Sequence, residues 1–149
     1  SRQDIVFDWD DILTMQGNSG PYMQYTYVRT QSVLAKFQMS NVKSQKVLAP
    51  SPYNLNPEER ALLVLLSRFG DTVAEAATRY APNILCAYLF ELAQCFNGFY
   101  QKHQILNPSA ELRTRAEDVR DFRLALTQAT GEIIKKGLEL LGIQVPERM

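Results

Sequence analysis

The stretch PNILCAYLFELAQCFNGFYQKHQ, residues 82–104, decides the fold that this sequence predicts. Its apolar residues Leu85, Leu89, Leu92 and Phe96 recur at steps of four, three and four, the spacing that places side chains on one face of an α-helix. The proline that opens the stretch is tolerated in the first turn of a helix. The stretch therefore predicts one long helix with a single buried stripe.

Start and stop signals predict further helices on both sides of this stretch. They place helices from Pro21 to about Met39, from Asn56 to Gly70, from Asp71 to about Tyr80, and from near Ser109 or Glu117 to Leu141, with Gly142 as the final stop. Residues 40–56 are expected to form a loop. No segment shows sustained alternation with a period of two, and β-branched residues are sparse. The sequence therefore predicts an all-α fold, a single domain over residues 1–149 built as a bundle of about five helices.

The last predicted helix has its own apolar stripe. We expect the following residues to face the core: Val119, Phe122, Leu126, Ala129, Ile133 and Leu140.

Composition excludes several classes of protein. The chain has 149 residues, enough for one domain with a core, and its 16 basic and 16 acidic residues leave no net charge. Any contact with nucleic acid must therefore come from a local patch. No apolar run reaches membrane-spanning length and no signal peptide leads the chain, so we expect a cytoplasmic protein or a fragment of a longer one. The spacing of Cys86 and Cys95 favours buried free thiols over a disulfide or a metal site.

The sequence offers no set of catalytic residues. The sequence fixes no acid or nucleophile beside its one histidine, His103, and it contains no phosphate-binding glycine loop and no zinc-type cluster. Asp8, Asp10 and Asp11 lie close together, but a solvated face or a helix cap explains them better than a metal site. The chain by itself is expected to be a binding module without catalytic residues, metal or cofactor.

The helix that begins near Pro21 carries an unusual number of tyrosines, in the stretch GNSGPYMQYTYVRT of residues 17–30. At about 100° per residue, its core face would carry Met23, Tyr27, Thr30, Leu34 and Phe37. A second face, well away from the first, would carry Tyr22, Tyr25, Arg29, Ser32 and Lys36. Aromatic rings stack on single-stranded bases, and arginine donates to phosphates or base edges, so this face suits RNA. The alternative is that Tyr22 and Tyr25 pack against a neighbouring helix with their hydroxyls outward.

Three segments of the chain match successive parts of one known domain: GNSGPYMQYTYVR of residues 17–29 with FDWD at residues 7–10 before it, APNILCAYLFELAQCFNGFY of residues 81–100, and residues 123–149 with their PERM ending. Together they resemble the opening, a second pattern and the terminal helix and ending of the C-terminal, DALR-type anticodon-binding domain of arginyl-tRNA synthetases. The matches follow the family's order and span nearly the whole chain. Asn83 departs from the histidine or serine common there, but asparagine serves a similar polar role at a helix start.

The resemblance implies that the chain is part of a class Ia synthetase that joins arginine to its tRNA with ATP and magnesium. The family's nucleotide-binding signatures lie upstream of this domain, and neither occurs here. KFQMSNVKSQ, residues 36–45, lies in the wrong place for the catalytic loop. The implied partners are the anticodon loop of arginine tRNA and the catalytic domain of the same protein, with no DNA and no membrane.

The resemblance also implies which residues bind tRNA. Tyr22, Tyr25 and Arg29 match positions that touch the anticodon loop, and Tyr100 matches a tyrosine that contacts an anticodon base. Met149 matches a terminal residue that reaches the same pocket, so we expect the PERM ending to fold back toward Tyr100. The loop before the tyrosine helix matches one that approaches the same RNA, and its residues are Gln16, Gly17, Asn18, Ser19 and Gly20.

Two other functions stay open. Tyrosine and arginine are also common hot spots of protein interfaces, so the same face could bind a partner protein. A related domain from another class I synthetase is the other possibility. The PYMQY run and the PERM ending favour the arginine enzyme over it.

Overall fold

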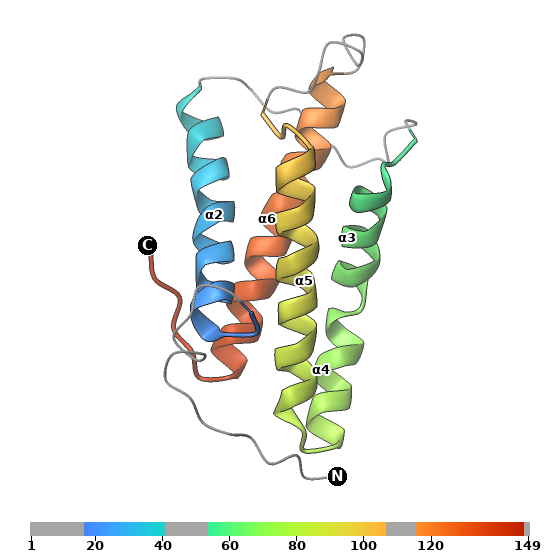
Figure 1. Ribbon diagram of the computed structural model, residues 1–149, viewed down its shortest axis with the longest axis vertical. Coiled ribbons are helices and arrows are strands. Elements are labelled where there is room, and N and C mark those ends of the chain that lie inside the picture. Colours follow the sequence, from blue (N-terminus) through green and yellow to red (C-terminus); the bar gives the residue numbers. More distant parts are fainter. Residues whose placement is uncertain (1–16, 41–53, 107–115, 148–149) are drawn as a thin grey trace.

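The computed structural model describes residues 17–40, 54–106 and 116–147. These residues form five helices and no strand: α2 (Gly20–Met39), α3 (Pro57–Ser67), α4 (Phe69–Thr78), α5 (Pro82–Lys102) and α6 (Ala116–Leu140). The predicted all-α bundle is therefore confirmed. α5 and α6 form the centre, α2 packs along one side, and α3 and α4 follow each other along the other side (Figure 1).

Local signals explain most of the helix ends. The Ser19 hydroxyl caps α2 by accepting the backbone N–H of Tyr22 at 3.3 Å. At the start of α3 the carboxylate of Glu59 accepts the backbone N–H of Asn56 at 2.9 Å. α6 ends at Leu140, and just beyond it Gly142 has a φ of 77°, the left-handed conformation that glycine adopts without strain. The helix end predicted at Gly70 is wrong. α3 ends at Ser67, the chain bends at Arg68, and Gly70 lies inside α4.

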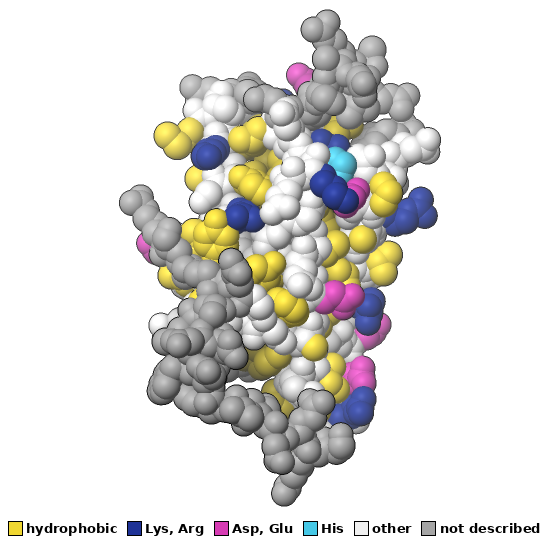
Figure 2. Space-filling view, in the orientation of Figure 1, with side chains coloured by type: hydrophobic (Ala, Val, Ile, Leu, Met, Phe, Trp, Pro, Cys, Tyr) yellow, Lys and Arg dark blue, Asp and Glu magenta, His cyan; other side chains and the backbone are white. Residues whose placement is uncertain are grey.

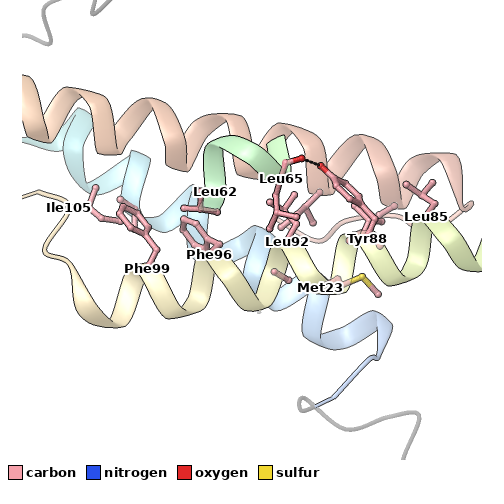
Figure 3. Close-up of a cluster of buried hydrophobic side chains, with 14 of the residues drawn as sticks. Met23, Leu62, Leu65, Leu85, Tyr88, Leu92, Phe96, Phe99 and Ile105 are labelled. Carbon is pink, nitrogen blue, oxygen red and sulfur yellow. Dashed lines mark hydrogen bonds between the residues drawn. The ribbon is translucent and has the colours of Figure 1, made fainter. Parts of the chain in front are cut away.

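The stripe predicted on α5 is the centre of the core. Leu85, Leu89, Leu92 and Phe96 are all buried, as predicted, and they pack with side chains of α2, α3 and α6 (Figure 3). The Tyr88 hydroxyl donates to the carbonyl oxygen of Leu65 at 2.8 Å, which joins α5 to the end of α3. α5 therefore positions every other helix of the bundle.

The stripe predicted on α6 is partly wrong. Val119 and Leu126 are buried, but Leu140 is 57% exposed. The prediction also missed a set of buried residues on this helix: Leu124, Thr127, Thr130, Ile134 and Leu138. A single stripe assumes one partner, whereas α6 packs against α2, α3 and α5 and so buries a wider arc.

Candidate nucleic-acid interface

α2 presents a different face to the core from the predicted one. Its buried residues are Met23, Thr26, Thr30 and Val33, whereas Tyr27 is only partly buried. The buried arc is rotated by about 40° toward the face that carries the tyrosines and Arg29. Two threonines can be buried because their hydroxyls donate to backbone carbonyl oxygens one turn earlier, Thr26 to Tyr22 at 3.0 Å and Thr30 to Tyr27 at 2.7 Å.

As a result, the predicted binding face lies at the edge where α2 meets α5, and the guanidinium of Arg29 is held there. Its central carbon lies 4.7 Å from the ring centroid of Tyr25 and 4.9 Å from that of Tyr100. Arg29 also donates to the Tyr25 hydroxyl at 2.8 Å and to Oδ1 of Asn97 at 2.6 Å. These bonds use two of the five N–H donors of the side chain. The structure therefore brings Tyr100, which is distant in the sequence, to Tyr25 and Arg29.

Asn97 of α5 organises this cluster, and sequence reasoning missed it. Its side chain is only 8% exposed. While Oδ1 accepts from Arg29, Nδ2 donates to the hydroxyls of Tyr22 and Thr26, each at 3.0 Å. One signal could have found it, since asparagine is a poor helix former and this one sits next to Phe96 of the buried stripe.

The tyrosines of the predicted site take two different roles. Tyr25 and Tyr100 are 39% and 38% exposed, so part of each ring is open to solvent. Tyr22 is partly buried and meets Phe90 of α5 edge to face, with ring centroids 5.6 Å apart. Tyr22 thus packs against a neighbouring helix, as the alternative expected, although its hydroxyl points to Asn97 and not outward. Its contact with tRNA stays a prediction. Tyr25 and Tyr100 are therefore more exposed than Tyr22.

The loop before α2 also divides into reachable and unreachable residues. Gly17 and Asn18 are exposed and Gly20 is partly exposed, while Ser19 is buried and its hydroxyl is used as the helix cap. Gly17 has a φ of 83°, a conformation that favours glycine. Gln16 lies outside the described residues, as do Met149 and the FDWD segment.

The end of the chain returns toward this site. After α6 the chain turns back beside the first half of α2 (Figure 1). Ile143 and Val145 pack against the core, and Nε2 of Gln24 donates to the carbonyl oxygen of Gln144 at 2.7 Å. Glu147 is the last described residue, so the predicted approach of the PERM ending to Tyr100 stays a prediction.

The remaining reactive groups of the described residues include two cysteines. Cys86 and Cys95 are free, as predicted, but partly rather than fully buried. Burial raises the pKa of the Cys95 thiol, which disfavours the nucleophilic thiolate. Within the described segments no three histidine, cysteine or acidic side chains are grouped so that they could hold a metal ion. In the same segments no helix is both long enough and apolar enough to cross a bilayer.

Comparison with known proteins points to one family. The model of the "DALR anticodon binding domain" matches residues 23–149. Arginine–tRNA ligase of Halothermothrix orenii is 44% identical over 149 residues, which cover 99% of this chain and 24% of that protein. The enzyme of Escherichia coli O127:H6 is 41% identical over 147 residues, 98% of this chain and 24% of that protein. The chain thus spans about a quarter of the length of these curated relatives.

Solved structures of arginyl-tRNA synthetases are also similar to this chain. Thermus thermophilus arginyl-tRNA synthetase aligns with a TM-score of 0.73 at 36% identity, over 92% of this chain and 22% of that one. Arginyl-tRNA synthetase from Plasmodium falciparum aligns with a TM-score of 0.77 at 24% identity, which shows a shared fold.

Proposed function

We propose a function from the premise that this chain belongs to the DALR anticodon binding domain family: it binds the anticodon loop of arginine tRNA. One observation carries the proposal. A cation and two half-open aromatic rings, Arg29 with Tyr25 and Tyr100, are fixed together at one edge of the bundle. Such a cluster suits single-stranded RNA, because rings stack on bases and guanidinium N–H groups donate to phosphates or base edges.

The genetic code defines what this site must recognise. Arginine codons share only their middle base, so the middle anticodon base is always cytosine. Stacking on Tyr25 and Tyr100 accepts any base, whereas hydrogen bonds to the pairing edge distinguish cytosine. The exposed backbone at Gly17 and Asn18 and the free N–H donors of Arg29 supply such groups. Gln16, Met149 and the loop residue Gly20 belong to the same proposed site.

The rest of the activity is proposed to lie elsewhere in a longer protein. The relatives are arginine–tRNA ligases about four times as long as the matched segment. We therefore propose that residues 1–149 form one tRNA-binding domain, and that a separate catalytic domain of the same chain uses ATP with magnesium. The site of action would be the cytoplasm. The alternative, a module that binds a partner protein, gains no support from the family match.

Binding to anticodon stem–loop RNAs tests this proposal. The chain is titrated, by fluorescence anisotropy at about 50 mM salt, with the arginine stem–loop and with the same RNA carrying uracil at the middle position. We expect tighter binding of the cytosine RNA. Tyr25→Ala should weaken that binding by about 1–3 kcal/mol, since one stacking platform is lost, without changing the helical circular dichroism spectrum.

Tyr80→Ala is the matched control, because Tyr80 is a 94% exposed tyrosine of another part of the surface. Equal losses for Tyr25→Ala and Tyr80→Ala, or equal binding of the two RNAs, would contradict the proposal.

A further inference from the structure

An open groove of about 530 Å³ lies beside the cluster of Arg29, Tyr25 and Tyr100, between the second half of α2 and the end of α5. Its volume is in the range of about 300–1,000 Å³ that is usual for clefts that bind small ligands. Residues Tyr100 to Leu106 line it on one side, and Val33 and Lys36 of α2 line it on the other. Sequence reasoning gave this groove no role.

Tyr100 makes the groove continuous with the proposed anticodon site. The guanidinium of Arg29 lies 4.9 Å from the centroid of the Tyr100 ring, and the same residue lines the groove. The groove is therefore the space next to Tyr25 and Tyr100 that a neighbouring nucleotide would meet.

The floor of the groove is apolar and its margins are basic. Val33 and Ile105 are buried hydrophobic residues, which suits the face of a base. Lys36 is exposed, and it makes no ion pair with the part of the chain that the structure describes. Figure 2 shows this face, with basic side chains over α2 and the end of α5 and hydrophobic side chains between them.

Glu58, an acid at the other margin, is paired with two residues that line the groove. Oε1 of Glu58 lies 2.6 Å from Nζ of Lys102, and Oε2 lies 3.2 Å from Nε2 of His103. The hydrogen bond from Lys102 is the main reason why the pKa of Glu58 falls to about 2. The carboxylate is therefore held by its two neighbours, and Lys36 and Arg29 leave this side of the molecule with a positive balance that suits a phosphate.

We propose that this groove holds the nucleotide next to the one bound at Tyr25, Arg29 and Tyr100, with its base over Val33 and Ile105 and its phosphate at Lys36. This inference rests on the proposed function, and it extends the RNA path by one nucleotide along α2. It assigns Lys36 to a phosphate and not to the recognition of a particular base.

The test measures how the affinity for the arginine stem–loop depends on salt. The association constant K falls as salt rises, so the slope of log K against log salt concentration is negative. Lys36→Ala should make this slope less negative by about 0.7, the value for one phosphate contact with single-stranded RNA. At about 50 mM salt this amounts to a loss of affinity of roughly fivefold to tenfold. Lys36→Arg keeps the charge and should retain most of the affinity. Lys136→Ala, which removes an exposed lysine of α6 outside the groove, should leave both the slope and the affinity unchanged.

A change in the RNA identifies the contact. Uncharged methylphosphonates are placed one at a time in the stem–loop, on either side of the middle cytosine. One of them should cost the unsubstituted protein about as much affinity as Lys36→Ala, and should cost Lys36→Ala nothing further.

The nucleotide site in the groove would be contradicted if the losses from Lys36→Ala and from the methylphosphonate add up, or if Lys36→Ala binds RNA as Lys136→Ala does. The proposed function would still stand if the cytosine RNA binds more tightly. A chain that binds neither stem–loop would overturn the proposed function together with the groove.

Discussion

Asn97 shows how one buried side chain can prepare an exposed site. Its single acceptor holds Arg29, and its two N–H groups hold Tyr22 and Thr26. A guanidinium that is ordered before RNA arrives loses less conformational entropy on binding than a mobile one. We therefore expect Asn97, which is buried, to act as a positioning residue for Arg29.

Replacing this side chain should weaken RNA binding while the helical fold is kept. In Asn97→Ala the hydrogen bond to Arg29 is lost, and bonds to charged groups contribute about 1.5–3 kcal/mol. That loss falls on the stability of the fold, whereas binding loses only the prior ordering of Arg29, so we expect the free energy of stem–loop binding to become less favourable by about 0.5–1.5 kcal/mol, measured well below the melting temperature. The helical spectrum should remain.

Thr26→Val separates positioning from stability. It removes one partner of Asn97 inside the bundle but leaves the bond between Asn97 and Arg29 in place. This variant should lose stability and keep its RNA affinity. If both variants lose stability and neither loses affinity, Asn97 is a structural residue only.

At the scale of elements, close approach between helices depends on glycine. A Cβ atom added to Gly131 of α6 would collide with Oγ1 of Thr30 and would lie 3.3 Å from its Cβ, so α6 and α2 are in contact there. Thr30 is fully buried and its hydroxyl is bonded to Tyr27, so it cannot move aside. A Cβ atom added to Gly98 of α5 meets nothing within 4 Å.

The same substitution should therefore have opposite effects on the two helices. Alanine favours a helix over glycine by about 1 kcal/mol, so Gly98→Ala should stabilise the fold by up to that amount. Gly131→Ala gains the same propensity but overpacks the interface, at a cost of about 1–3 kcal/mol. We expect its net effect to be destabilising in urea unfolding. Stabilisation by both substitutions would mean that α2 and α6 separate easily.

Periodicity predicted the elements better than it predicted their faces. The stripe on α5 is correct because α5 lies in the middle and its apolar residues outnumber the positions that it must bury. The predicted face of α2 is wrong by about 40°, because Thr26 and Val33 were not expected inside. Thr26 can be buried there because its hydroxyl donates to the backbone carbonyl oxygen of Tyr22. A polar residue can occupy the buried face of a helix only where a hydrogen-bond partner is available for it.

At the scale of the whole molecule, buried polar groups join helices that are distant in sequence. Glu59 at the start of α3 accepts from Nε of Arg123 of α6 at 2.8 Å, and Arg123 also donates to the carbonyl oxygen of Gln104 at 2.8 Å. The Tyr88 hydroxyl joins α5 to α3 in the same way. Unfolding exposes all of these groups together.

Tyr88 should make the stability of the fold sensitive to alkali. Burial raises the pKa of Tyr88 to about 12, whereas an unfolded tyrosine titrates near 10. Its contribution to stability is therefore complete below pH 10 and is lost as the pH rises from 10 to 12. By about pH 11 we expect a loss of about 1 kcal/mol from this residue alone, measured by urea unfolding.

Tyr88→Phe is the reference for that measurement, because the other tyrosines titrate in both proteins. At pH 8 the variant should be less stable by about 1 kcal/mol, the value of one hydrogen bond. This difference should shrink as the pH approaches 11. Two stability curves that run parallel over this range would contradict the assignment to Tyr88.

The sequence by itself determined the helices, most of their ends and the central stripe of α5, because capping, helix propensity and periodicity act over a few residues. It also placed Tyr22, Tyr25, Arg29 and Tyr100 in one proposed site through a family resemblance. Only the tertiary structure decided that Tyr22 is packed inward, that Asn97 holds Arg29 against two rings, and that a basic groove continues beyond Tyr100. These features arise where α2 meets α5, some 70 residues apart in the chain, and no local pattern fixes how far a helix rotates about its own axis when it packs.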